Sequence, residues 1–186
     1  MHTKKPPLAL LGLFLAGVAS AEIVELIADP VASVIEARMA ASPPHSFTGT
    51  VNHYQLDLRA DTDAGQLTAA RFQFDFADFD TQNEKRDRKM HTWMDSALYP
   101  EVGFVLTRIE NSEAGLVAVG DFTMHGQTRE LRLPFTFSGD GKRFTLDTTY
   151  SLDHRDWGLP KVRLLIFTVN PVLEINIHLE GTYGAA

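Results

Sequence analysis

The sequence contains no cysteine in its 186 residues. Disulfide bonds are therefore excluded, and the fold must be held together by its core alone. The same absence excludes the acylated cysteine of a bacterial lipoprotein, so we expect no covalent lipid anchor. Since 44% of the residues are hydrophobic, a chain of this length can bury the core of one domain without cross-links.

Positive charge is also scarce. Lys and Arg together number 17, whereas Asp and Glu number 24, which gives a formal net charge of -7. Because nucleic-acid binding draws its affinity from cationic side chains, we expect no nucleic-acid partner.

Motifs of the common enzyme classes are missing. The sequence has no G-x-S-x-G, no P-loop, no dinucleotide-binding glycine motif and no H-E-x-x-H zinc motif. The histidines after residue 21 are His45, His53, His91, His125, His154 and His178. Only His91 has a helical i, i+4 partner, Asp95, and a lone pair of this kind is usually a solvated contact. We predict no catalytic residue, no metal and no cofactor, although strands that bring distant residues together leave a metal-assisted hydrolase as an alternative.

The N-terminal residues have the pattern of a secretory signal peptide. Lys4 and Lys5 precede an apolar run, Pro6 to Val18, and the small residues Ala19-Ser20-Ala21 follow it. The run is too short to span a membrane comfortably. We therefore predict a signal peptide over residues 1–21, cleaved near Ala21, and a soluble domain over residues 22–186 in the periplasm or outside the cell.

One stretch has helical periodicity. Met90, Trp93, Met94 and Ala97 recur at i, i+3, i+4 and i+7, which places four apolar groups on one side of a helix. Thr81 and Glu84 have the spacing of a capping box, and Tyr99-Pro100 predicts the end of the helix. The spacing thus predicts one short helix at about residues 81–97.

The remaining segments alternate between polar and apolar residues, which predicts β-strands. Phe72, Phe74 and Phe76 share one face of the clearest strand. The expected strands are residues 22–39, broken at Asp29-Pro30, then 46–61, 67–76, 101–110, 116–124, 130–138, 144–152 and 172–183. His125-Gly126-Gln127 predicts a tight turn, in which the glycine supplies a positive φ.

About eight strands with short turns indicate an all-β protein built from one antiparallel sheet. Closing such a sheet into an eight-stranded barrel pairs every edge and covers every apolar face. The helix at residues 81–97 then caps or flanks the barrel. A barrel of this size can hold one slender apolar ligand, but periodicity leaves open whether the interior is hollow or filled.

The sequence contains an ordered set of motifs: Ser46-Phe47-Thr48-Gly49, Asn83-x-x-Arg86-Asp87, Tyr99-Pro100-x-x-x-Phe104, His125-Gly126-x-Thr128-Arg129 and Arg155-x-x-Gly158. Over about residues 28–183, this set resembles the YceI-like family of periplasmic polyisoprenoid-binding proteins. The resemblance implies a lipocalin-like barrel with an apolar channel for a long isoprenoid chain, such as that of a quinone or a polyprenyl carrier. The sequence departs from the family pattern at Met94-Asp95, at Glu130 and in the long connector from Pro160 to Pro171.

Apolar strand faces supply the candidate lining of such a channel, with packing into a filled core as the alternative role. The candidates are Phe72, Phe74, Phe76, Met90, Trp93, Met94, Phe104, Leu131, Leu133, Phe135, Phe137, Ile175 and Ile177. Met90, Trp93 and Met94 form a second group on the helix, since thioethers adapt to an irregular chain.

Polar residues of the motifs are expected to have structural roles. They are Asn83, Arg86, Asp87, Tyr99, Pro100, His125, Gly126, Arg129, Arg155 and Gly158. We expect capping and ion pairs at the helix start, and a buried Arg155 that holds a loop carbonyl or carboxylate.

These observations favour an exported, non-catalytic carrier of an isoprenoid lipid. The alternative is a periplasmic interaction or stress-response module with a filled barrel. A homodimer and transient contact with a membrane surface are both compatible with the sequence. The apolar run Leu164 to Val169 is left open as a strand, part of the mouth or a contact for a partner.

Overall fold

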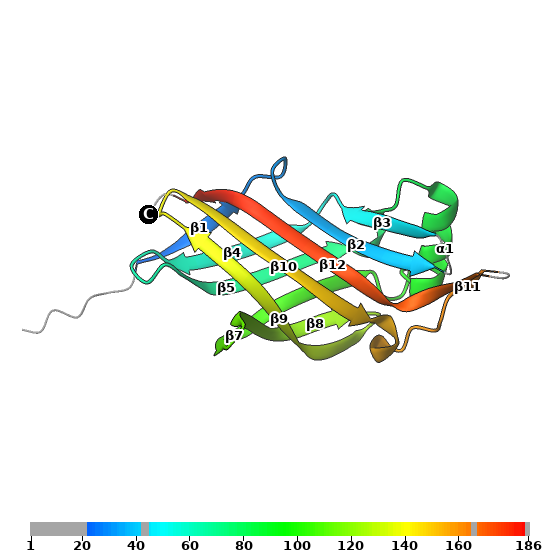
Figure 1. The fold of residues 1–186 in the computed structure, drawn as a ribbon. Coiled ribbons are helices and arrows are strands. Elements are labelled where there is room, and N and C mark those ends of the chain that lie inside the picture. The colour runs from blue at the N-terminus through cyan, green and yellow to red at the C-terminus, as the bar shows by residue number, and fades with distance from the viewer. Residues whose placement is uncertain (1–21, 42–44, 165–166, 185–186) are drawn as a thin grey trace, which may run out of the picture.

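The computed structural model describes residues 22–41, 45–164 and 167–184, and the predicted signal peptide lies outside them. Most of the described chain is β-strand (Figure 1). The strands are β1 (Ile23–Ala28), β2 (Val34–Ala41), β3 (Ser46–Val51), β4 (Gln55–Asp61), β5 (Gln66–Asp75), β6 (Phe79–Asp80), β7 (Glu101–Ser112), β8 (Gly115–Met124), β9 (Gln127–Gly139), β10 (Arg143–Asp153), β11 (Arg163–Leu164) and β12 (Phe167–Tyr183). The helical elements are η1 (Phe76–Asp78), α1 (Glu84–Met94) and η2 (His154–Trp157).

Eight strands form a closed antiparallel barrel, as the sequence predicts. Their order around the ring is β1-β4-β5-β7-β8-β9-β10-β12, and β1 pairs with β12 to close it. Leu26 of β1 lies opposite Leu58 of β4 on one side and opposite Tyr183 of β12 on the other. The first and last strands of the chain therefore complete the ring.

β12 pairs with two different strands, β1 and β2, along the same edge. Its last residues pair with β1, and its earlier part, from Val169 to His178, pairs with β2. β2 continues to β3 and β3 pairs with β6, so these strands extend the wall at the end of the barrel next to α1 (Figure 1). The predicted break at Asp29-Pro30 is confirmed, because it separates β1 from β2.

The prediction of one strand over residues 46–61 is wrong. The chain forms β3 and β4, interrupted between Val51 and Gln55. The two segments have different partners, since β3 pairs with β2 and β6 whereas β4 pairs with β1 and β5. A change of partner is a feature of the sheet that local alternation does not record.

The strands alternate as the period-two pattern requires. On β9, Leu131 and Phe135 are buried, and Glu130 and Arg132 are exposed. β8 and β9 are joined by a two-residue turn at His125 and Gly126, whose φ angles are 51° and 66°. Positive φ at both central residues is the geometry of a type I′ hairpin turn, so the predicted turn is confirmed.

The helix is shorter than predicted, and its N-cap is Asn83 rather than Thr81. The Asn83 Oδ1 accepts a hydrogen bond from the Arg86 N–H at 3.0 Å. Gln82 has a φ of 59°, so the chain turns sharply between Thr81 and the helix start. Asp95 ends the helix in the left-handed region, with φ of 50°, before Tyr99-Pro100 is reached.

The connector before β12 also contains strand. β11 pairs with the start of β12 through Arg163 and Thr168 and through Leu164 and Phe167, whereas residues 165–166 lie outside the described part. The described part of the stretch Leu164 to Val169 therefore lies in β11 and β12, which pair with each other. Among the described helices, none is long and apolar enough to cross a membrane.

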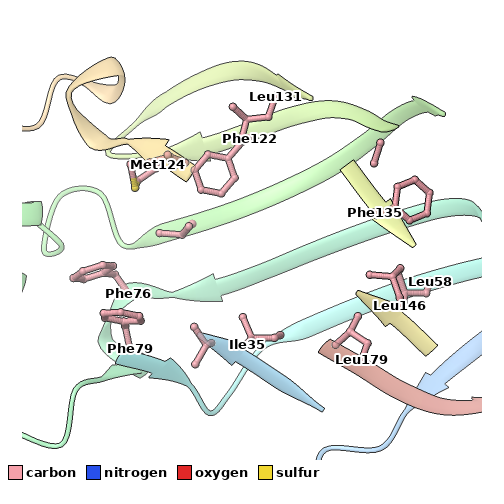
Figure 2. Close-up of a cluster of buried hydrophobic side chains, with 14 of the residues drawn as sticks. Ile35, Leu58, Phe76, Phe79, Phe122, Met124, Leu131, Phe135, Leu146 and Leu179 are labelled. Atoms are coloured by element: carbon pink, nitrogen blue, oxygen red, sulfur yellow. The ribbon is translucent and has the colours of Figure 1, made fainter. Parts of the chain in front are cut away.

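One end of the barrel interior is filled with side chains. Leu58, Leu146 and Leu179 come together from β4, β10 and β12, as Figure 2 shows, and each is less than a tenth exposed. Phe144 on β10 is stacked on Phe137 with ring centroids 6.3 Å apart. We call this end, where β1 joins β12, the filled half.

Candidate functional site

The other end of the barrel, next to α1, encloses an apolar cavity of about 380 Å³. We call this end the hollow half. Its wall includes Phe76 and Phe79, whose stacked rings lie 5.6 Å apart, and Phe122 and Met124 of β8 (Figure 2). Four residues of the filled half do not line this cavity: Leu58, Phe144, Leu146 and Leu179. The barrel is thus both filled and hollow, at opposite ends.

Most of the lining residues proposed from the sequence lie on the cavity wall. These are Phe72, Phe74, Phe76, Met90, Trp93, Phe104, Leu131, Leu133, Ile175 and Ile177. They come from β5, η1, α1, β7, β9 and β12, so both strands and the helix contribute to the wall of the cavity.

Three of the proposed lining residues lie elsewhere. Met94 is 0% exposed and packs into the core at the end of α1. Phe135 and Phe137 share the inward face of β9 with Leu131 and Leu133, but they lie further along the strand, where the interior is filled. The face of a strand predicts inward orientation only, whereas position along the barrel axis depends on strand register.

Several cavity residues were not predicted as lining. They are Ile35, Ala37, Met39, Phe47, Val51, Phe79, Val102, Phe122, Met124, Tyr150, Leu152, His154, Val162, Val169 and Leu173, together with the polar residues Glu36, Asn83, Lys85, Arg86, Lys89, Thr148 and Asn170. On β10, the period-two signal was available, because Tyr150, Leu152 and His154 follow one another at intervals of two. His154 extends this inward-facing set by one position into η2.

The N-terminus of α1 is tied to the strand that precedes it. Thr81 is buried, and its Oγ1 donates to the Asp87 Oδ1 at 2.5 Å and accepts from the Arg86 Nε at 2.8 Å. The Arg86 Nη2 also donates to the Thr81 carbonyl at 2.7 Å, and its guanidinium lies 4.4 Å from the Phe47 ring centroid. Hydrogen bonds to charged groups are stronger than neutral ones, so this cluster fixes the helix over the cavity.

The C-terminal end of α1 is tied to the segment after η2. The Trp93 indole N–H donates to the Pro160 carbonyl at 2.8 Å. The Trp93 ring also meets the His154 ring edge to face, with centroids 4.9 Å apart. α1 is therefore held at both ends, by polar contacts at its start and by an aromatic residue at its end.

Two more motif residues support the β8–β9 turn. Tyr99 packs on Gly126, where an added Cβ would come within 2.6 Å of the ring, and its ring centroid lies 4.9 Å from that of His125. The His125 Nδ1 donates to the Trp157 carbonyl at 3.0 Å, which joins the turn to η2. The Pro100 carbonyl accepts from the Phe76 N–H at 2.7 Å.

The expectation of a buried Arg155 is wrong. Its side chain is 47% exposed and pairs with Asp153, the N-cap of η2, with 2.9 Å between Nε and the nearer carboxylate oxygen. The hydrogen bond from Arg155 lowers the pKa of Asp153 to about 2. Gly158 ends η2 with a φ of 76°, and Arg129 is exposed on β9. These residues shape the loop outside the cavity.

His154 is the unusual polar residue of the cavity. It is 3% exposed, and among the described residues its two ring nitrogens are the only buried side-chain nitrogen or oxygen atoms without a hydrogen-bond partner. Burial lowers the pKa of His154, while the nearby Leu159 backbone and the Asp153 carboxylate oppose this shift. A buried polar group without a partner costs roughly 1–3 kcal/mol, so the protein carries a neutral imidazole here at the expense of stability.

Four charged residues contribute to the cavity lining, namely Glu36, Lys85, Arg86 and Lys89. Lys85 and Lys89 of α1 are exposed, in a chain that is acidic as a whole. Within residues 22–41, 45–164 and 167–184, no group of three or more His, Asp or Glu side chains could hold a metal ion.

The fold and the cavity place this protein among the small antiparallel β-barrels with a hollow interior. Residues 27–181 match the YceI-like domain, so the chain belongs to this family, as the motifs predict. The resemblance stated from the sequence is confirmed.

Known relatives include bacterial proteins described as UPF0312 protein. Those of Pseudomonas savastanoi and Pseudomonas syringae pv. syringae are each 30% identical over 110 residues, which cover 54% of this chain and 55% of the relative. The chain thus spans about half the length of the curated relatives it matches.

Solved structures share the fold at low sequence identity. BcnA of Burkholderia cenocepacia matches with a TM-score of 0.72 and 19% identity, over 84% of this chain and 100% of that one. A polyisoprenoid binding domain from Saccharophagus degradans matches with a TM-score of 0.63 and 11% identity, over 89% and 100% of the two chains.

Removing the Thr81 hydroxyl from the cluster at the start of α1 should lower the free energy of unfolding. Thr81→Val keeps the shape of the side chain but removes the partner shared by Arg86 and Asp87, so the free energy of unfolding should fall by roughly 1–3 kcal/mol. Thr92→Val is the matched control, since the exposed Thr92 hydroxyl bonds only to the Arg88 carbonyl on the helix surface, and it should change stability by less than about 0.5 kcal/mol. Urea denaturation measures both; equal effects would contradict the assigned role of Thr81.

Replacing the buried His154 imidazole by an apolar side chain should stabilise the protein. His154→Leu should raise the free energy of unfolding by about 1–2 kcal/mol at neutral pH, because an unsatisfied polar group is replaced by an apolar one. His91→Leu is the control: the His91 Nδ1 is already paired with the Ser96 hydroxyl at 3.1 Å, so its removal should lower stability.

The free energy of unfolding should depend on pH differently in His154→Leu and in the unmodified protein. A histidine whose pKa is lowered in the folded state favours unfolding when it is protonated, so His154 costs stability as the pH falls below its unfolded value of about 6.5. His178, whose pKa is raised by its bond to Asp147, acts in the opposite direction in both proteins. The stability gained by His154→Leu should therefore grow between pH 7 and pH 5, as urea denaturation at several pH values would show. A constant difference would contradict the assignment.

Proposed function

We propose that this protein is an exported, non-catalytic carrier that holds a long-chain isoprenoid lipid in the hollow half of its barrel. The observation on which this depends is the apolar cavity of about 380 Å³ beneath α1. Ligand sites in proteins are typically cavities of roughly 300–1,000 Å³ with apolar walls and few polar groups. The cavity has these properties, whereas a barrel filled throughout, the alternative considered from the sequence, would have no such space.

The chemistry of the wall suits a hydrocarbon chain better than a polar ligand. Each buried CH₂ group of a ligand contributes about 0.8 kcal/mol by leaving water, with no need for directional contacts. Met39, Met90 and Met124 add flexible thioethers that adapt to the branched outline of an isoprenoid. The aromatic rings of β5 and η1 supply the rigid part of the wall.

A solved structure with the same fold supports this class of ligand. The Saccharophagus degradans neighbour is described as a polyisoprenoid binding domain, and the resemblance to it extends over most of this chain. At 11% identity, that resemblance concerns the fold.

Export and loading are further parts of the proposal. Lys4, Lys5 and the apolar run that follows support cleavage near Ala21 and a location in the periplasm or outside the cell. The exposed Lys85 and Lys89 support a transient contact with an anionic membrane surface, because such surfaces attract juxtaposed cations. The cavity edge would then meet the bilayer at the point where a lipid enters.

Organic extraction of the purified protein tests this function. Mass spectrometry of the extract should detect an isoprenoid lipid, or the protein stripped of lipid should take up an added prenylquinone in stoichiometric amount. Repeated extracts without lipid, together with no uptake of the added prenylquinone, would overturn the proposal.

A leucine-to-tryptophan substitution should have opposite effects on lipid uptake and on stability in the two halves of the barrel. Leu133→Trp extends into the cavity, so it should block lipid uptake while changing stability little. Leu146→Trp inserts the same ring into the filled half, so it should cost about 1–3 kcal/mol of stability and leave uptake intact. The indole N–H is common to both variants and cancels in the comparison. Lipid uptake and urea denaturation measure the two effects; retained uptake in Leu133→Trp would contradict the location of the site.

A further inference from the structure

The wall of the barrel is not paired along its whole length between β9 and β10. Within the described chain, these strands pair only over Thr136–Gly139 of β9 and Phe144–Asp147 of β10. Further toward α1, β9 pairs with β8 over residues 127–135, and β10 pairs with β12 over residues 148–153. These two segments face each other without a shared ladder, and we call the boundary between them the β9–β10 seam. It lies in the hollow half, because both segments contribute to the cavity wall.

Pro134 explains why the ladder ends where it does. Its carbonyl accepts a hydrogen bond from the Thr148 Oγ1 at 2.8 Å, so this carbonyl faces β10. In an antiparallel ladder, the N–H and the C=O of a bonded residue point to the same neighbouring strand, and proline has no N–H to donate. After the pair of Thr136 and Asp147, the next ladder bond would need that missing N–H. A side-chain hydroxyl takes the place of the backbone bond, and the seam begins there.

A second hollow, of about 430 Å³, lies at the start of the seam. We call it the outer hollow, because exposed residues of β9 and β10 contribute to its wall, namely Pro134, Thr136, Asp147 and Thr149. None of these four lines the cavity beneath α1. Three residues line both spaces: Glu36, Thr148 and Ile177. The cavity and the outer hollow therefore adjoin at the point where the ladder between β9 and β10 ends.

A long hydrocarbon chain in the cavity cannot continue along the axis of the barrel. Leu58, Leu146 and Leu179 occupy the interior there and line neither space. The cavity, at about 380 Å³, is near the lower end of the range for small-molecule sites, so a long chain needs further room. The seam is the place where further room adjoins the cavity, and no ladder between β9 and β10 has to be broken to reach it.

The side chains of the outer hollow suit a hydrocarbon chain better than a charged group. Two of its polar pairs bond to each other: the His178 Nδ1 lies 2.6 Å from the Asp147 Oδ1, and the Thr149 Oγ1 donates to the Asn176 Oδ1 at 2.9 Å. A chain that covers these pairs leaves them satisfied. The half-buried Glu36 carboxylate repels an anionic group. Apolar contacts come from Val34, Leu116, Pro134, Phe135 and Ile177.

We propose that the outer hollow is a second part of the binding site, which takes the end of a lipid chain too long for the cavity. The chain leaves the barrel sideways, between β9 and β10, past Thr148 and Ile177. Its end lies on the outer face of the barrel, over β10 and β12. This inference rests on the proposed function and adds to it a preference for long chains.

The test compares two chain lengths and blocks the outer hollow alone. Ubiquinone-2 and ubiquinone-6 share one head group and differ only in the number of isoprene units. Thr136→Trp fills the outer hollow from an exposed position that does not line the cavity. Thr48→Trp is the matched control, since Thr48 is an exposed strand threonine that lines neither space. Affinity is measured by competition with a fluorescent apolar probe, and urea denaturation checks that each variant is folded.

The expected result is a loss confined to the long chain. Thr136→Trp should bind ubiquinone-6 at least about tenfold more weakly than the unmodified protein does, because losing the burial of about two CH₂ groups already gives this factor. It should bind ubiquinone-2 within about twofold of the unmodified protein. Thr48→Trp should keep both affinities. Comparing variants with the same lipid cancels the difference in water solubility between the two lipids.

A fluorescent label gives a second measurement that does not depend on blocking the site. Because the chain contains no cysteine, Thr136→Cys and Thr48→Cys each provide a single position for an environment-sensitive fluorophore. Ubiquinone-6 should shift the emission of the label at residue 136, whereas ubiquinone-2 should not. The label at residue 48 should respond to neither lipid.

Three outcomes would overturn the inference. If Thr136→Trp binds ubiquinone-6 as tightly as the unmodified protein, or if the label at residue 136 does not respond to it, the chain does not reach the outer hollow. If Thr136→Trp weakens both lipids equally, the effect is structural. In these two cases the carrier function stands, because the unmodified protein still binds lipid. If the unmodified protein binds neither lipid, the carrier function fails together with the inference.

Discussion

The closure of the barrel depends on backbone hydrogen bonds between β12 and two different strands along one edge. β1 pairs with the last residues of β12, and β2 pairs with the earlier ones. At the β1 end the ring is complete, so leucine and phenylalanine side chains from opposite walls meet and fill the interior. At the β2 end the wall continues through β3 and β6, and α1 covers the opening.

This division separates the part of the molecule that provides stability from the part that can accept a ligand. The filled half buries Leu58, Leu146 and Leu179, which contribute to the hydrophobic stabilisation that a chain without disulfides needs. The hollow half belongs to the same buried cluster, but it leaves a cavity in front of its side chains and contains the buried imidazole of His154. Sites that bind ligands commonly violate the rules of core packing, and stability is supplied elsewhere in the fold.

Much of the fold could be predicted because strand alternation and helix periodicity are local. The aromatic face of β5, the turn at His125 and Gly126 and the position of α1 all follow from neighbouring residues. The division of residues 46–61 into β3 and β4 could not be predicted, because it arises from a change of partner strand. Likewise, Leu133 and Phe137 both lie on the inward face of β9, and the alternation in the sequence does not separate them. Their positions along the strand place Leu133 at the cavity and Phe137 in the filled half.

The candidate site was predicted only in part, for a related reason. An inward-facing residue is recognisable from its period, but the space in front of it is a property of the opposite wall. His154 follows the charged Asp153, and its sequence neighbours give no sign that its nitrogens lack partners. The motif residues Arg86 and Asp87 were expected at the helix start, whereas their shared partner, the Thr81 hydroxyl, became visible only in three dimensions.

The pairing of β1 with β12 also has a consequence for folding kinetics. Leu26 and Tyr183 lie opposite each other across that pairing, although nearly the whole described chain separates them. Contacts between distant segments are slow to form, since the entropy of closing a long loop is lost before the contacts can compensate for it. The ring therefore cannot close during synthesis until the last strand has emerged. Hairpins such as β8–β9 can form early, but the cavity exists only after the two ends of the chain have met.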